Sequence, residues 1–247
     1  LYFMNVYVPK VFGYEQAIRS MYMSKRSYNE EIEKKIQMAC QTGIDPYTGK
    51  VDKEASPDLN DMLDKLFNMG KKHITVLRFL NFDIITMGMH RAGQDDIDAH
   101  ARRFDNRIIR NSTRLAKFVQ DEFSEFYQDK VMTTDKMVGL LGINLPDVVN
   151  VENQSTGESH IYRKAPNGYV REEYIEDKDV LRGLYMLGIP SDFMSQINVT
   201  EFAHVYKLRN RNTKANPEVK RWAEFVLVKL QDKCPWCTEE LMMTLEN

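Results

Sequence analysis

The stretch ANPEVKRWAEFVLVKLQDKCPW, residues 215–236, carries the clearest structural signal in the chain. Asn216-Pro217 is typical of a helix start, because Asn caps free N–H groups and proline is favoured at the first helical position. Apolar residues then recur at helical spacing on one face: Val219, Trp222, Ala223, Val226 and Leu230. Cys234-Pro235 ends this pattern. We therefore expect a long amphipathic helix packed on a core.

Other helix signals lie upstream. Ser27 with Glu30 has the form of a capping box. Ser56-Pro57 predicts a second helix start, and Gly70 its end. Asn198 is placed to open a further helix.

Strand signals lie between these helices. Alternation through Leu80, Phe82 and Ile84 predicts a strand that leads to Gly88, and an irregular polar segment is expected over 89–98. Residues 158–175 contain two short β-like runs around Pro166-Asn167-Gly168, which predicts a hairpin. We expect one helix-rich α+β domain over 1–247 with a central mixed or antiparallel sheet, in which 1–3 are the remnant of a tag.

Composition excludes several classes of protein. Of 247 residues, 43% are hydrophobic and 28% charged, which argues against wholesale disorder. Thirty-four Lys and Arg against thirty-six Asp and Glu give a net charge of -2, which argues against a nucleic-acid or membrane-surface protein acting through bulk charge. The 3 cysteines favour a reducing, cytoplasmic setting, and no apolar run reaches membrane-spanning length.

The C-terminal stretch also resembles a known family. Leu208-Arg209, a polar loop, Ala215 to Val219 and finally Pro235-Trp236 are similar to the end of flavin-dependent thymidylate synthases. In that family a Leu-Arg pair precedes an Ala-Gln-x-Glu-Ile helix that finishes near a Pro-Trp. The resemblance implies the fold of that family.

Two further blocks support the resemblance. Residues 70–92 resemble the segment in which Gly-His-x-Ser/Thr precedes a strand and Ser-Arg-Ala, with His73, Thr75 and His90-Arg91-Ala92 at those positions. A gap-free continuation places His100 on the histidine of the Arg-His-Arg signature and Asn106 on its asparagine. Residues 182–198 resemble the nucleotide-binding and flavin-contacting block. A rival alignment uses Ser112-Thr113-Arg114 and sacrifices His100.

The sequence departs from the family at its signature. Arg-His-Arg reads Ala99-His100-Ala101, so both arginines are missing. The family's glutamine falls on Asp96, and a flavin-contacting asparagine falls on His204. The serine and arginine after the signature fall on Ile109 and Asn111.

The resemblance implies one-carbon transfer from methylenetetrahydrofolate to C5 of a pyrimidine nucleotide such as dUMP, with FAD as cofactor, NADPH as co-substrate and a homotetramer as assembly. It implies Arg209 and His73 as catalytic residues. The implied flavin contacts are Thr75, His100, Asn106, Asn198 and His204, and the implied substrate contacts are Arg182, Arg209, Asp96 and Arg107. In the family the arginine that matches Arg209 faces the pyrimidine, where a fixed cation is suited to stabilising developing negative charge. Ordinary alternatives remain for these residues: a helix-end or helix-face arginine, a structural histidine or an N-cap.

The basic segment 102–117 carries arginines at helical spacing, Arg103, Arg107, Arg110 and Arg114, which is typical of one basic helix face. Three interpretations compete: a solvated surface or subunit contact, a replacement anion site that compensates for Ala99 and Ala101, and a nucleic-acid contact, which we rank last. Residues 115–126 predict another helix.

Two functional alternatives follow from the missing arginines. One keeps the chemistry with another uracil or cytosine nucleotide as substrate. The other is a non-catalytic homologue that binds a nucleotide or partner through the 102–117 segment. No metal site is expected, because Cys234 and Cys237 form a single Cys-x-x-Cys pair, most simply interpreted as two helix-end thiols packed near Trp236.

Overall fold

The computed structural model describes residues 3–100, 106–110, 134–165, 168–176, 190–211 and 215–245. The chain divides into two compact units. One comprises Leu1–Met4, Gly88–Ala92 and Arg110–Ser191, and the other Asn5–Met87, Gly93–Ile109 and Asp192–Asn247. That the whole chain forms one domain stays a prediction.

A sheet runs through the larger unit in the strand order β1, β3, β8, β4, with β2 also paired to β3. Its strands are β1 (Asn5–Tyr7), β2 (Val11–Phe12), β3 (Asn81–His90), β4 (Asn106–Arg110) and β8 (Pro190–Asn198). Both β1 and β2 run antiparallel to β3, with Val6 opposite Thr86 and Val11 opposite Phe82. The predicted α+β fold with a central sheet is confirmed.

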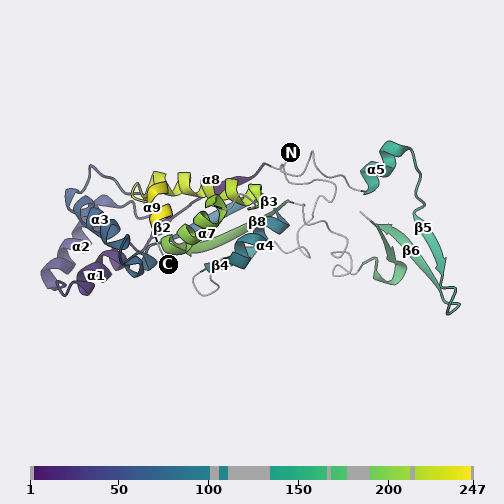
Figure 1. Cartoon of the computed structure of the whole chain (residues 1–247), viewed down its shortest axis with the longest axis horizontal. Helices are drawn as coiled ribbons and strands as arrows, with labels where there is room; N and C mark the ends of the chain where they lie inside the picture. Colours follow the sequence, from purple (N-terminus) through teal and green to yellow (C-terminus); the bar gives the residue numbers. More distant parts are fainter. Residues whose placement is uncertain are drawn as a thin grey trace. The chain divides into compact units, whose positions relative to one another are not determined.

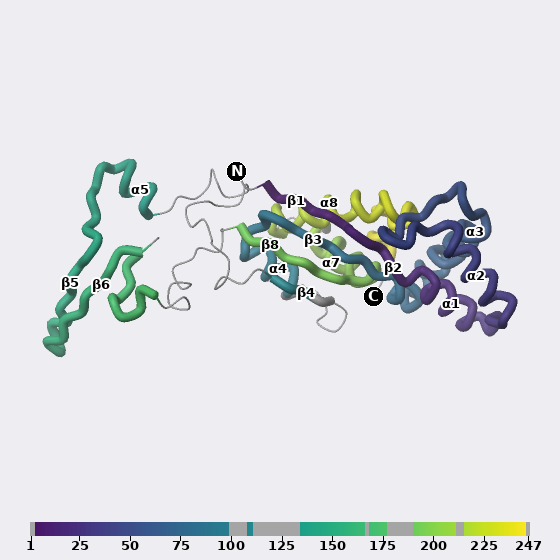
Figure 2. Tube along the Cα trace, turned by 180° about the vertical axis from the view of Figure 1, so that it is seen from behind, coloured from purple at the N-terminus to yellow at the C-terminus, as the bar shows by residue number. Residues whose placement is uncertain are grey.

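Helices cover one face of this sheet and extend beyond one end of it. Figures 1 and 2 show α7 (Val199–Arg211) and α8 (Pro217–Lys233) together on one face, with β1, β3 and β8 on the viewer's side in Figure 2. The N-terminal helices α1 (Tyr14–Ser24), α2 (Glu30–Gly43) and α3 (Pro57–Gly70) pack on one another and on the 3-10 helix η1 (Ile74–Phe79). The short α9 (Glu239–Thr244) packs on α7.

Four aromatic rings join the sheet to these helices. Phe82 of β3 meets Phe202 of α7 edge to face at 5.5 Å, and Phe202 meets Trp222 of α8 at 6.4 Å. Phe193 of β8 lies 6.3 Å from Trp222. The indole Nε1 of Trp222 donates to Thr86 Oγ1 at 2.8 Å, so the one polar atom of this buried ring has a partner. The apolar face predicted from the C-terminal stretch is therefore the core face of α8.

Helix caps explain where three of these helices begin. Ser56 Oγ accepts from the Leu59 N–H at 3.2 Å, and Asn216 Oδ1 accepts from the Glu218 N–H at 3.0 Å, as predicted. The Ser27 capping box is wrong. Asn29 is the N-cap of α2, because its Oδ1 accepts from the Ile32 N–H at 2.9 Å.

Two further expectations are corrected. The segment expected to be irregular over 89–98 ends β3 and then forms α4 (Arg91–His100), which buries Ile97 on its inner face. The helical basic face is wrong over 106–110, where the chain forms β4. β4 gains hydrogen bonds from β8, a partner that helical spacing cannot reveal. The rest of the basic segment and the helix expected over 115–126 lie outside the described residues.

The smaller unit contains a three-stranded antiparallel sheet in the order β5, β6, β7. Its described elements are α5 (Thr134–Leu141), β5 (Val148–Glu152), β6 (Ser159–Ala165), β7 (Gly168–Arg171) and η2 (Glu172–Tyr174). Ala165 pairs with Gly168 and Tyr162 with Arg171, so the predicted hairpin is confirmed. That it is an addition to the family fold stays a prediction. In the described part of the chain, no helix combines the length and apolarity needed to cross a membrane.

Candidate functional site

Arg209, in the last turn of α7, is held by Asp96 of α4. Its Nη1 lies 3.0 Å from Asp96 Oδ2, and its Nη2 lies 3.0 Å from both Oδ1 and the backbone oxygen of Asp96. The Arg209 side chain is only 6% exposed, against 27% for Asp96. This two-pronged contact fixes the plane of the guanidinium and neutralises its charge.

The sequence of α7 explains why this arginine is buried. Phe202, Tyr206 and Arg209 follow one another at helical spacing, and all three are buried. The face that packs on the sheet therefore ends in a charged side chain, and burial of that charge requires an opposite charge nearby. Asp96 supplies it from a helix 113 residues earlier in the chain. Sequence reasoning named both residues as substrate contacts but missed their pairing.

Asn198 caps α7. Its Oδ1 accepts from the Thr200 hydroxyl at 2.6 Å and from the Glu201 N–H at 2.9 Å, and the residue is 4% exposed. An N-cap of this kind stabilises a helix by about 1 kcal/mol. The side-chain oxygen is thus engaged within the fold, which favours the capping interpretation over a flavin contact through that oxygen.

His73 and Thr75 lie at the start of η1, and both are exposed. η1 packs on α7, and its end is tied to the start of that helix by a 3.0 Å hydrogen bond from the Val199 N–H to the Leu80 oxygen. His204 lies half-buried on α7. The structure therefore places three predicted flavin contacts on two helices that touch.

These residues fit a flavin in part. The imidazole of His73 and the hydroxyl of Thr75 are accessible hydrogen-bonding groups, as a bound isoalloxazine requires. The Asn198 oxygen is committed to its cap, so it does not fit that role. In this respect η1 is the better-supported half of the predicted flavin site.

Several predicted site residues cannot be placed. Arg182 lies outside the described residues. His100 ends α4, and Asn106 and Arg107 begin β4, but their side chains lie outside the described part of the structure. Among the described residues, no cluster of three or more His, Cys, Asp and Glu side chains could hold a metal ion.

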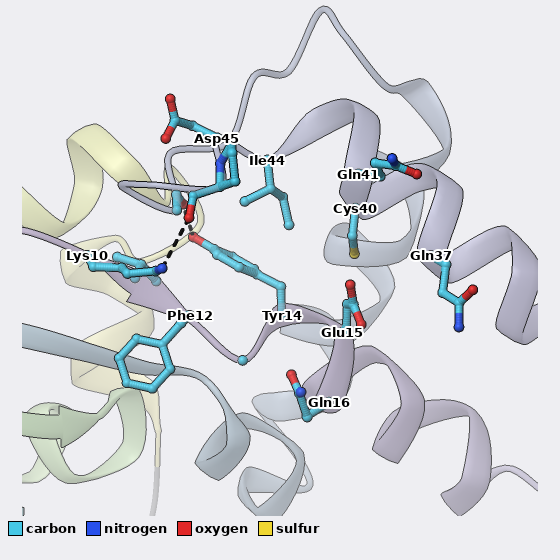
Figure 3. Close-up of a pocket in the computed structure, with 14 residues that line it drawn as sticks. Lys10, Phe12, Tyr14, Glu15, Gln16, Gln37, Cys40, Gln41, Ile44 and Asp45 are labelled. Atoms are coloured by element: carbon cyan, nitrogen blue, oxygen red, sulfur yellow. Dashed lines mark hydrogen bonds between the residues drawn. The ribbon is translucent and has the colours of Figure 1, made fainter.

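A separate cavity of about 670 Å³ lies among the N-terminal elements. Figure 3 shows it between the start of α1, α2 and the loop over 44–49, with the Tyr14 hydroxyl pointing at that loop. Tyr14 donates to the Gly49 oxygen at 3.0 Å, and Lys10 Nζ donates to the Pro46 oxygen at 3.1 Å. Cys40 also lines the cavity and is 5% exposed. The sequence analysis did not predict this cavity, because its walls are 35 residues apart at the Tyr14–Gly49 contact.

Comparison with known sequences gives no relative. No protein-family model matches the sequence, and no curated protein matches it.

Comparison with solved structures does give a likeness. One is a crystal structure of thymidylate synthase X (ThyX) from Helicobacter pylori with FAD and dUMP, with a TM-score of 0.51 and 14% identity over 97% of this chain and 99% of that one. Another is a crystal structure of the flavin-dependent thymidylate synthase ThyX from the same organism, complexed with the same two ligands. It has a TM-score of 0.56 and 13% identity over 96% of this chain and 99% of that one. At this identity the likeness shows the fold alone: the chain has a ThyX-like α+β fold.

Proposed function

We propose that this protein is a ThyX-like enzyme that binds FAD and a pyrimidine nucleotide and transfers a one-carbon unit to C5 of the base. The observation that carries the proposal is the buried, oriented Arg209 within a fold that matches ThyX structures along almost the whole chain. Those structures contain FAD and dUMP, which is why a uracil nucleotide is the first substrate to test.

In this proposal η1 and α7 hold the two ligands. His73 and Thr75 offer an imidazole and a hydroxyl to the flavin, and His204 lies on the neighbouring helix. When bound, FAD would supply hydride chemistry, with NADPH as reductant and methylenetetrahydrofolate as carbon donor. Arg209 would face the pyrimidine and stabilise the enolate-like negative charge on the base that makes C5 nucleophilic. Asp96 would keep the guanidinium in place.

The remaining parts of the proposal rest on the resemblance. Arg182, Arg107, His100 and Asn106 would complete the nucleotide and flavin contacts. A homotetramer would share sites between subunits, and a cytoplasmic setting would suit cysteines that are free in this structure.

Release of tritium from C5-labelled dUMP, UMP and dCMP tests the proposed reaction, with FAD, NADPH and methylenetetrahydrofolate supplied. We expect release from one of these nucleotides and a loss of at least about a hundredfold in Arg209→Ala, since one electrostatic contact to a developing charge has about that effect. Glu33→Gln, which alters an arginine–carboxylate pair on α1 and α2, is the matched control and should leave the rate unchanged. No release from any of the three would contradict the proposed reaction.

A second candidate function is nucleotide binding without catalysis. The specific observation in its favour is that Asp96 neutralises Arg209, in a chain whose signature reads Ala99-His100-Ala101. Bound FAD and nucleotide together with no tritium release would favour this candidate. The basic 102–117 segment as its contact surface stays a prediction.

A further inference from the structure

Cys234 and Cys237 lie in a tight turn between α8 and α9. The Cys234 N–H donates to the Leu230 oxygen at 2.8 Å and so ends α8, and the Cys237 N–H donates back to the Cys234 oxygen at 2.9 Å. A hydrogen bond across four residues brings their Cα atoms within about 7 Å. A disulfide needs Cα atoms about 4.4–6.8 Å apart, so this turn holds the two cysteines close to the separation at which a disulfide can form.

The turn is held firmly on both sides. The ring of Trp236, between the two cysteines, stacks on Phe67 at 6.2 Å and donates from Nε1 to Asp64 Oδ1 at 2.6 Å. Lys53 Nζ lies 4.6 Å from the centre of the same ring. After the turn, Thr238 caps α9 through the Leu241 N–H at 3.1 Å. These contacts anchor the turn that carries the two cysteines.

The two sulfurs are unequal. Burial opposes ionisation of the Cys234 thiol, but hydrogen bonding from the Cys237 thiol and from backbone N–H groups outweighs burial, so the pKa of Cys234 is lowered. Burial, together with the hydrogen bond to Cys234, raises the pKa of Cys237. Cys234 is thus the more readily ionised thiol of the two, and a lowered pKa of one cysteine is a feature of reactive Cys-x-x-Cys pairs.

Access to the pair is restricted to small molecules. Both cysteines are 0% exposed. Tyr14 lines the 670 Å³ cavity and lies close enough to Cys234 for the two groups to affect each other's ionisation, so the dithiol lies near this wall of the cavity. A water-sized oxidant can reach the dithiol in a local fluctuation, whereas a tripeptide disulfide cannot reach a fully buried sulfur without opening the fold.

We propose that Cys234 and Cys237 form a reversible redox modification site that hydrogen peroxide converts to an intramolecular disulfide. The Cys234 thiolate attacks one peroxide oxygen, the O–O bond breaks, and hydroxide leaves to give a sulfenic acid. Cys237 Sγ then attacks Cys234 Sγ, which forms the S–S bond and expels the oxygen as water. Two thiols and one peroxide thus give one disulfide and two waters, and a dithiol reductant reverses the change.

Cys40 provides an internal comparison. It lines the cavity directly and is more exposed than the pair. Burial raises the pKa of its thiol to about 12, and the nearby Glu15 carboxylate adds to this effect. The Cys40 side chain points toward Glu15 in Figure 3. We therefore expect the less accessible pair to oxidise faster than the more accessible single thiol.

Peptide mass measurement tests the proposal on the full chain. The folded protein is treated with hydrogen peroxide, its remaining thiols are blocked under denaturing conditions, and it is cut with trypsin. Cleavage after Lys233 puts both cysteines on one peptide, residues 234–247, and Cys40 on another, residues 36–50. We expect the first peptide to lose two hydrogen atoms and not to react with the blocking reagent, with full recovery of both thiols in dithiothreitol. Cys40 should remain a thiol and should react with the blocking reagent.

Variants sharpen the test. Cys237→Ser should leave Cys234 as a sulfenic acid that dimedone captures when the peroxide-treated protein is denatured in its presence, and Cys40→Ser should not change disulfide formation. Circular dichroism confirms that each variant is folded.

Three outcomes would overturn the proposal: a pair that stays a dithiol in the folded wild-type protein under peroxide, a pair that oxidises no faster than Cys40, or a glutathione adduct on Cys234 after treatment of the folded protein with oxidised glutathione. None of these measurements depends on flavin or nucleotide binding, so the result stands apart from the proposed function.

Discussion

Two of the arginine–carboxylate pairs among the described residues engage both carboxylate oxygens but lie in different surroundings. Arg19 of α1 contacts both carboxylate oxygens of Glu33 of α2, at 2.8 and 2.6 Å. Arg209 contacts both oxygens of Asp96, at 3.0 Å each. The arginine side chain is 26% exposed in the first pair and 6% exposed in the second.

This difference in exposure separates two uses of the same contact. The Arg19 and Glu33 side chains keep 26% and 22% of their surface in water, so partial solvation lowers the energetic consequence of their pair. The Arg209 guanidinium is largely removed from solvent, so the fold depends on Asp96 to compensate its charge. A buried pair at the proposed nucleotide site therefore controls both stability and the charge that a ligand meets.

Removal of the buried carboxylate should have the largest effect. Asp96→Ala leaves the Arg209 charge buried without its carboxylate, and we expect a loss of about 3–5 kcal/mol in the free energy of unfolding. Urea denaturation measures it. Arg209→Met is the matched variant and should lose less, because Asp96 is 27% exposed and can be hydrated. Equal losses in the two variants would contradict the asymmetry.

Neutralisation of Asp96 without loss of its shape should change ligand affinity. Asp96→Asn removes the negative charge that offsets Arg209, so an anionic nucleotide should bind about tenfold more tightly. Isothermal titration with dUMP and with uridine separates the two ligands, since the uncharged nucleoside should show a smaller change. Unchanged or weaker dUMP binding would mean that Arg209 does not face the nucleotide.

Truncation of the α7 cap tests the capping role of Asn198. Asn198→Ala should cost about 1 kcal/mol of stability, because the N–H of Glu201 and the hydroxyl of Thr200 lose their acceptor. FAD affinity should stay at the wild-type value in this variant and fall in Thr75→Ala. A loss of FAD binding in folded Asn198→Ala would restore Asn198 as a flavin contact.

The half-buried Arg19–Glu33 pair should show the smallest effect, visible mainly in acid. Hydrogen bonding from Arg19 lowers the pKa of Glu33 from 4.5 to about 2. A lowered carboxylate pKa adds stability that is fully present above pH 4.5 and is lost as the pH falls toward 2. Glu33→Gln should lack this part of the acid dependence in urea midpoints between those pH values. The same acid dependence in both proteins would contradict the assignment.

The sequence predicted those features of the fold that depend on contacts between residues close together in the chain. Ser56-Pro57 and Asn216-Pro217 predicted helix starts correctly, because a cap bonds to an N–H two or three residues away. The β4 strand was missed because its hydrogen-bonding partner, β8, is distant in the chain. Capping signals also compete, as the choice of Asn29 over Ser27 shows.

The sequence indicated which residues belong to the candidate site, but not which of them contact one another. The resemblance named Arg209 and Asp96, but their pairing across 113 residues required the fold. The sequence did not predict a role for Tyr14, because no local feature of the sequence brings Tyr14 near Gly49 or Cys234. Whether the named residues bind flavin or nucleotide stays a prediction.

Titration of the purified protein with FAD tests the central claim most directly, that this ThyX-like fold holds a flavin at η1. We expect a saturable change in the flavin absorption spectrum with the wild-type protein, and weaker FAD binding in His73→Ala and Thr75→Ala. A protein that takes up no FAD, or that binds FAD equally well without both side chains, would contradict a flavin site at η1.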